Sequence, residues 1–123
     1  MSDGNASEGQ APRPAVYLLD YLMRMRQDNL RRQLLLNMGD IDITRMVAFV
    51  DGYRACQFAN GLEDVEYGLF CDWLRDVKQE FPTDGWAAKY LRDCDGDHEC
   101  AIRKFFDFIA EFVALRERER QGS

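Results

Sequence analysis

Long apolar runs, serine and histidine are scarce in this sequence of 123 residues. The apolar runs span only a few residues, far short of the roughly 20 that a membrane-spanning helix needs. The start, MSDGNASEGQAPRP, has neither the basic residues nor the apolar stretch of a secretory signal. Serine occurs only in the expected tails, and no glycine-rich phosphate loop is present. We therefore expect no membrane span and no secretory leader, and serine catalysis is nearly excluded.

Cysteine is present at four positions, Cys56, Cys71, Cys94 and Cys100. Four cysteines are enough for two disulfides in a secreted protein. Because no export signal is expected, we instead predict reduced thiols and a cytoplasmic location. Cys56 and Cys71 fall within helical patterns, where a buried free thiol behaves as a small apolar side chain.

The length and composition predict one folded domain. Apolar residues make up 46% of the chain, which is enough to bury a core without disulfide or metal staples. The formal net charge is −6, and it is unevenly placed, because residues 63–99 alone hold eleven acids and four bases, a net charge of −7. This acidic middle argues against nucleic-acid binding, which needs a basic surface.

The apolar spacing is helical along the whole chain, and no strand-like alternation competes with it. We predict an all-α, single-domain bundle of about five helices with an aromatic-rich core over 15–118, between disordered tails at 1–14 and 119–123. The two threonines stand where helix starts need a capping oxygen. The helices are expected from about 14 to 37, from Thr44 to the glycine at 61, from about 64 to 80, after Thr83 through 86–91, and through 101–113.

The stretch DCDGDHEC, residues 93–100, concentrates possible metal ligands. A calcium loop starting at Asp93 needs Gly at its sixth position and Glu at its twelfth, where this chain has His98 and Lys104. A structural zinc site needs four ligands, and the stretch supplies two cysteines and one histidine at a spacing that matches no common finger. We therefore expect no metal and no cofactor.

Two further interpretations of the same stretch differ in what they require. A nucleophilic Cys94 or Cys100 with His98 as its base needs a geometry that proximity in sequence does not supply. A corner between two helices needs only local preferences: Gly96 ends one helix, and Asp97 caps the next. The corner is the interpretation with the fewest assumptions.

Four segments follow one another in a recognisable order: a capped helix ending near a Gly-Tyr pair, a Trp-Leu helix, a Gly-Trp turn and a Phe-Phe helix. They read DITRMVAFVDGYRACQF (42–58), FCDWL (70–74), GWAAKYL (85–91) and GDHECAIRKFFDFIAEF (96–112). Over residues 38–112 the chain resembles a loosely defined group of small bacterial all-helical proteins without assigned activity, similar to immunity proteins of toxin–immunity neighbourhoods. The resemblance implies a toxin-neutralising protein and supplies no catalytic residue. The N-terminal helix, with RMRQDNLRRQ, departs from that group.

The leading functional hypothesis is a non-enzymatic protein-binding module, an immunity protein that neutralises a basic toxin domain through an acidic surface. On the third expected helix, Asp64, Asp72 and Asp76 fall away from the Trp73 face, so we expect them to be available to a basic partner. Glu66 projects toward the apolar face, where it would complement the helix start or pair with an arginine of the first helix.

Two other interpretations stay open at this stage. One is a small cytoplasmic enzyme that uses a carboxylate or Cys94, which a pocket holding an acid with a strongly shifted pKa would favour. The other is a homodimer built on the N-terminal helix, whose two apolar sides would suit a second copy. Neither interpretation adds a catalytic residue that the sequence supports.

Overall fold

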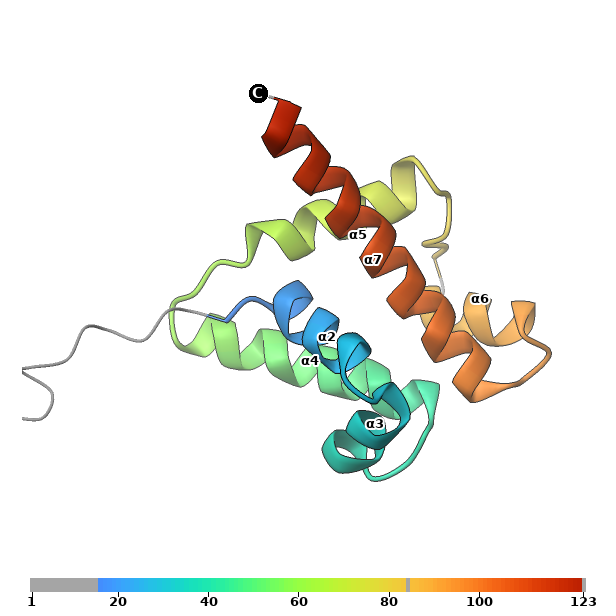
Figure 1. Ribbon diagram of the computed structural model, residues 1–123. Coiled ribbons are helices and arrows are strands. Elements are labelled where there is room, and N and C mark those ends of the chain that lie inside the picture. Colours follow the sequence, from blue (N-terminus) through green and yellow to red (C-terminus); the bar gives the residue numbers. More distant parts are fainter. Residues whose placement is uncertain (1–15, 84, 123) are drawn as a thin grey trace, which may run out of the picture.

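The computed structural model describes residues 16–83 and 85–122, and all regular structure in those residues is α-helical (Figure 1). The prediction of an all-α single domain with an aromatic core is confirmed, with six helices in these residues rather than about five. None of these helices has the length and apolar character that a bilayer span requires. The helices are α2 (Leu18–Gln27), α3 (Leu30–Met38), α4 (Ile43–Ala59), α5 (Val65–Asp76), α6 (Trp86–Asp93) and α7 (His98–Gly122).

The additional helix arises because the helix predicted over 14–37 is interrupted. α2 ends at Gln27, and Asn29 then caps α3 by accepting a hydrogen bond from the Arg32 N–H at 3.1 Å. An asparagine side chain competes for nearby backbone N–H groups and so favours caps over helix interiors. This local bond breaks the helix although the apolar spacing continues through it.

The helix starts differ from the prediction that threonines cap them. Asp42 caps α4, because its carboxylate accepts hydrogen bonds from the Thr44 N–H at 2.7 Å and the Arg45 N–H at 3.2 Å. α6 begins after Gly85, which offers no side-chain cap. The predictions for Thr44 and Thr83 are therefore wrong, in the first case because an aspartate two residues earlier already reaches the free N–H groups.

α7 is the element around which the others are arranged, and it crosses the molecule as one long diagonal in Figure 1. α2, α4, α5 and α6 all pack against it. Trp86 of α6 stacks on Phe105 with ring centroids 3.9 Å apart, and Phe70 of α5 contacts both Phe105 and Phe112. α7 is helical through Gly122, so the tail predicted at 119–123 is wrong for residues 119–122. The tail predicted at 1–14 lies outside the described residues.

Candidate functional site

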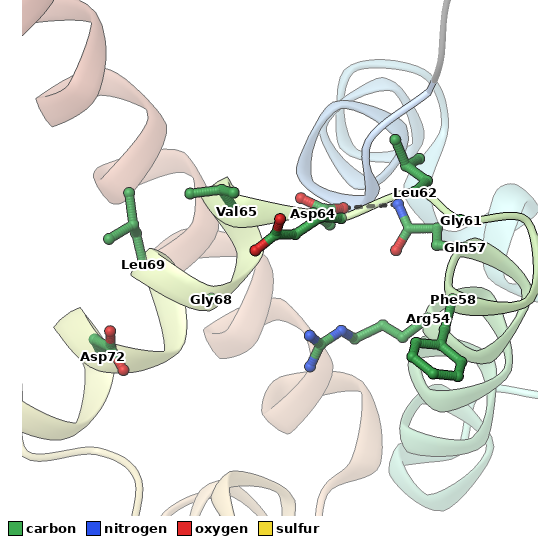
Figure 2. Close-up of a pocket in the computed structure, with 11 residues that line it drawn as sticks. Arg54, Gln57, Phe58, Gly61, Leu62, Asp64, Val65, Gly68, Leu69 and Asp72 are labelled. Atoms are coloured by element: carbon green, nitrogen blue, oxygen red, sulfur yellow. Dashed lines mark hydrogen bonds between the residues drawn. The ribbon is translucent and has the colours of Figure 1, made fainter.

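A groove of about 710 Å³ runs between the C-terminal half of α4 and the first two turns of α5. The loop that joins the two helices closes one end of it. In Figure 2 the two helices lie on opposite sides of this space, and the Arg54 side chain extends into it from α4. The lining residues are Arg54, Gln57, Phe58, Gly61, Leu62, Glu63, Asp64, Val65, Gly68, Leu69 and Asp72.

Large apolar side chains stand at the rim of this groove without cover. Phe58 of α4 is 86% exposed, and on α5 Val65 is 55% and Leu69 38% exposed. Scattered exposed apolar residues are normal on a soluble protein, whereas several gathered around one concave surface mark an interaction site. Three such residues on neighbouring turns of α4 and α5 therefore mark this groove as a candidate interaction site.

Among the described residues that line the groove, Arg54 is the only base. Its guanidinium lies over the Tyr67 ring, 4.8 Å from the ring centroid, and reaches from α4 toward α5 (Figure 2). Within the described residues no carboxylate lies close enough to form an ion pair with it. A cation–π contact leaves the N–H donors in the plane of the guanidinium available, so Arg54 can still donate to a carboxylate or a carbonyl.

Acidic side chains outnumber this base along the groove. Glu63 and Asp72 are exposed at the rim, and Asp64 lies at the closed end. Three acids against one base give the lining a net negative charge. The surface therefore attracts a cation or a basic protein segment more readily than an anion.

Asp64 was predicted to be available to a partner, and that prediction of exposure is wrong. The residue is only 8% exposed and serves as the N-cap of α5. Its carboxylate accepts three hydrogen bonds, from the Leu18 N–H at 2.9 Å, the Gln57 side-chain amide at 2.7 Å and the Tyr67 N–H at 3.2 Å. Asp64 therefore ties the start of α2, the end of α4 and the start of α5 together.

Asp72 and Asp76 are exposed on α5, as the sequence predicted, but neither is a free charge. The Arg75 guanidinium donates to one oxygen of Asp72 at 3.0 Å and to both oxygens of Asp76, at 3.0 and 3.2 Å. The hydrogen bond from Arg75 lowers the pKa of Asp76 below its usual range. Of these two acids, Asp72 lines the groove.

Glu66 pairs with an arginine of the last helix rather than the first. The Arg116 guanidinium donates to both carboxylate oxygens, at 2.8 and 3.1 Å, and Arg120 lies 3.6 Å away. The hydrogen bonds from Arg116 hold the pKa of Glu66 below its usual value. This pair joins α5 to the part of α7 that lies beyond the helix predicted through 101–113.

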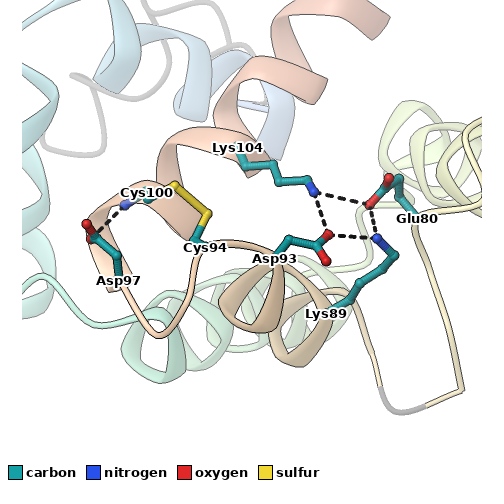
Figure 3. Close-up of a disulfide and its surroundings, with 7 residues drawn as sticks. All are labelled: Glu80, Lys89, Asp93, Cys94, Asp97, Cys100 and Lys104. Carbon is teal, nitrogen blue, oxygen red and sulfur yellow. Dashed lines mark hydrogen bonds and ion pairs between the residues drawn. A yellow bond between two sulfur atoms is a disulfide. The ribbon is translucent and has the colours of Figure 1, made fainter.

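The stretch 93–100 is the predicted corner between α6 and α7. Gly96 has φ 84°, and the Asp97 carboxylate accepts a hydrogen bond from the Cys100 N–H at 3.1 Å. Cys94 and Cys100 form a disulfide across the corner, with Cα atoms 5.9 Å apart (Figure 3). The prediction of reduced thiols is therefore wrong for these two residues. A disulfide is rare in a reducing cytosol, so it weighs against the cytoplasmic location, which stays a prediction.

The other two cysteines are free, as predicted, but they differ in burial. Cys71 is partly buried against the core, whereas Cys56 is exposed on α4. The prediction of a buried thiol is therefore wrong for Cys56. Cys56 falls within the helical pattern of α4, but at this position the side chain points to solvent rather than to the core.

The corner supplies neither a catalytic pair nor a metal-binding cluster within the described residues. The disulfide occupies the sulfur atoms of Cys94 and Cys100, and His98 Nδ1 accepts a hydrogen bond from the Ile43 N–H at 3.0 Å. Because Nδ1 is an acceptor here, His98 satisfies one of the unpaired N–H groups at the start of α4. Its role in this arrangement is to join α7 to α4.

Beside the disulfide, acids and bases form a closed network (Figure 3). Asp93 accepts from Lys104 at 2.6 Å and from Lys89 at 2.7 Å, and Lys89 also lies 3.0 Å from Glu80. The hydrogen bonds from Lys104 and Lys89 lower the pKa of Asp93 to about 2. These charges are matched within the chain and leave little for a ligand.

Of the exposed residues that line the groove, only Asp72 was among the partner-binding residues predicted from the sequence. A signal for Phe58 was present, because it lies outside the apolar face proposed for its helix, which held Met46, Phe49, Val50, Tyr53 and Cys56. Arg54 gave no comparable signal, since a single arginine on a helix is usually a solvated side chain. Comparison of the chain with known protein families, curated proteins and solved structures found no match.

Proposed function

We propose that this chain is a non-enzymatic protein-binding module that holds a basic protein in the groove between α4 and α5. The observation that carries the proposal is the 86% exposure of Phe58 beside a groove lined by three acids and one base. An exposed aromatic side chain at a concave surface is the usual anchor of a protein interface. The acidic rim would speed the encounter with a basic partner and make it sensitive to salt.

An immunity protein is the form of this function that the resemblance and the charge favour together. A toxin that acts on nucleic acid carries basic residues at its active site. Glu63 and Asp72 would face such residues, and Phe58 would contribute the apolar contact.

The test is affinity capture on immobilised protein from cells that produce this chain natively. Phe58→Ala removes the proposed anchor. Val77→Ala is the matched control, because Val77 is also an exposed apolar residue, at 67%, but does not line the groove. We expect one basic protein to bind the wild type and Val77→Ala at about 50 mM salt, and to bind much less at about 500 mM, where charges are screened.

The same protein should be lost from Phe58→Ala at either salt concentration, and the purified pair should reproduce that difference. Equal capture by all three proteins would contradict the proposal. Capture that is insensitive to salt would contradict its electrostatic part.

A further inference from the structure

The groove walls are two helix faces with matching periodicity. On α5 the lining residues Val65, Gly68, Leu69 and Asp72 follow the spacing i, i+3, i+4 and i+7, and on α4 Arg54, Gln57 and Phe58 follow i, i+3 and i+4. Residues at this spacing share one side of a helix. On α5 this side is separate from the buried face, whereas on α4 Arg54 and Phe58 are exposed and Gln57 is buried.

A glycine in the middle of α5 is not explained by the fold. Gly68 lacks a positive φ, and a Cβ added there would meet nothing within 4 Å. After proline, glycine is the least favourable residue in a helix interior, and because it has no Cβ it is used where the backbone and a ligand must come close. Gly52 in α4 has the same two properties but lies outside the groove lining.

From these observations we infer that the groove receives an amphipathic α-helix of the partner protein, whose backbone comes nearest to α5 at Gly68. The inference rests on the proposed function and specifies how the partner is held. Helices pack by fitting the side-chain rows of one into the grooves of another, and two facing walls with i, i+3, i+4 spacing suit a third helix between them. A peptide that binds by adding a β-strand would need a sheet edge, and the described residues contain no strand.

The chemistry of the groove defines the helix that fits it. An apolar stripe would cover Phe58, Val65 and Leu69, and Lys or Arg beside that stripe would meet Glu63 and Asp72 at the rim. Arg54 would donate to a carboxylate or to the free carbonyl groups at the C-terminal end of the incoming helix. Charge complementarity therefore selects a basic helix over an acidic one of the same apolar pattern.

The first experiment uses three synthetic peptides of about 18 residues, which form roughly five helical turns. The first places leucines at i, i+3 and i+7 with flanking lysines, the second replaces lysine by glutamate, and the third is the lysine peptide with a central proline, which breaks the helix. We expect the lysine peptide alone to give saturable amide shift changes in NMR spectra of the labelled protein, centred on Phe58, Val65, Gly68 and Leu69.

Three outcomes would overturn the inference. The first is that binding of the lysine peptide does not saturate by about 1 mM, which would mean negligible affinity. The second is equal binding of the proline peptide. The third is shift changes centred away from the groove. Shift changes at the same amides that grow with protein concentration alone would also overturn it, because a second copy of this chain would then be the occupant.

The second experiment compares Gly68→Leu with Gly52→Leu. Both side chains enter open space and replace a helix-interior glycine, so both variants should keep or raise the thermal midpoint. Gly68→Leu should lower the affinity for the lysine peptide by about tenfold or more, because the new side chain occupies the space that the incoming backbone needs. Gly52→Leu should leave the affinity unchanged. Equal affinities of the two variants would overturn the close approach at Gly68.

The two proposals can fail separately. If capture of a basic protein depends on Phe58 but no helical peptide binds, the chain is a protein-binding module and the helical mode of binding is wrong. If the lysine peptide binds in the groove but no basic protein is captured, the groove accepts a helix and the proposed function is wrong.

Discussion

The corner between α6 and α7 and the groove between α4 and α5 lie in one small domain but differ in how their groups are satisfied. At the corner a disulfide joins Cys94 to Cys100, and Asp93 takes hydrogen bonds from two lysines. At the groove Phe58 is exposed, and Arg54 has no ion pair with the described residues. Groups paired within a chain hold its fold, whereas groups left open around a concave surface are suited to recognition. The comparison assigns stability to the corner and the core, and binding to the groove.

The largest expected effect contrasts two phenylalanines. Phe106 on α7 is 1% exposed, and Phe106→Ala should lower the free energy of unfolding by about 3–5 kcal/mol through lost burial and a cavity. Phe58→Ala should change it by less than about 0.5 kcal/mol, because the side chain is already in solvent. Urea unfolding of both variants measures the contrast. A similar loss in the two would show that the groove is part of the core.

Asp64 and Asp72 offer the next contrast, because both line the groove but only Asp64 is buried. Asp64→Ala should cost about 3 kcal/mol of unfolding free energy, since it removes a helix cap and leaves other buried donors unpaired. Asp72→Ala should cost less than about 0.5 kcal/mol. Chemical denaturation with both variants checks this. An Asp64→Ala protein as stable as the wild type would contradict this structural role and would again make Asp64 a candidate for binding the partner.

Removing the disulfide tests the corner itself. Replacing Cys94 and Cys100 together by Ser opens a link between residues 6 apart in sequence, and the constraint on so short a loop is worth about 2 kcal/mol. Cys56→Ser is the control, because that thiol is free and exposed. Denaturation without reductant gives the stability, and intact mass gives the oxidation state. A wild-type mass that shows four free thiols would refute the bond.

The smallest effect is a pH dependence at the same corner. The pKa of Asp93 in the folded protein is about 2, below the ordinary value of 3.8, so its contribution to stability is present above about pH 4 and is lost as pH falls toward 2. Asp93→Asn should flatten the stability curve in that window only. Solvent reaches this network, so about 1 M salt should shrink the difference between variant and wild type. An identical acid limb in the two proteins at low salt would rule out the assignment.

The fold class and the main core face could be predicted from the sequence because they depend on local spacing. The apolar side chains of residues 101–113 recur with helical period, and the structure buries most of them under α7's neighbours. The break at Asn29 could not be predicted from that spacing, because one capping bond outweighs a pattern that continues on both sides. Thr44 is not a cap because Asp42, two residues earlier, already reaches the free N–H groups, and Thr83 is not a cap because α6 begins only after Gly85.

The site was less predictable because its geometry depends on contacts between distant segments. The helical spacing predicts Asp64 on the side away from Trp73, but it cannot show that Asp64 meets the Leu18 N–H from 46 positions earlier in the chain. The disulfide depends on how tight the corner at 93–100 is. The sequence predicts the corner, but the lack of an export signal favoured reduced thiols over a disulfide. Phe58 and Gly68 become informative only when α4 and α5 are seen as opposite walls.

The central claim is that the groove, and no other exposed apolar position, meets a partner. The most direct measurement replaces Phe58 by the photoreactive residue benzoylphenylalanine in cells that produce the chain natively, with the same replacement at Val77 as control. On irradiation we predict that position 58 crosslinks to one basic protein, through a segment with apolar residues at i, i+3 and i+7, and that position 77 does not. Equal crosslinking from both positions, no crosslink from position 58, or a crosslink only to a second copy of this chain would contradict the account.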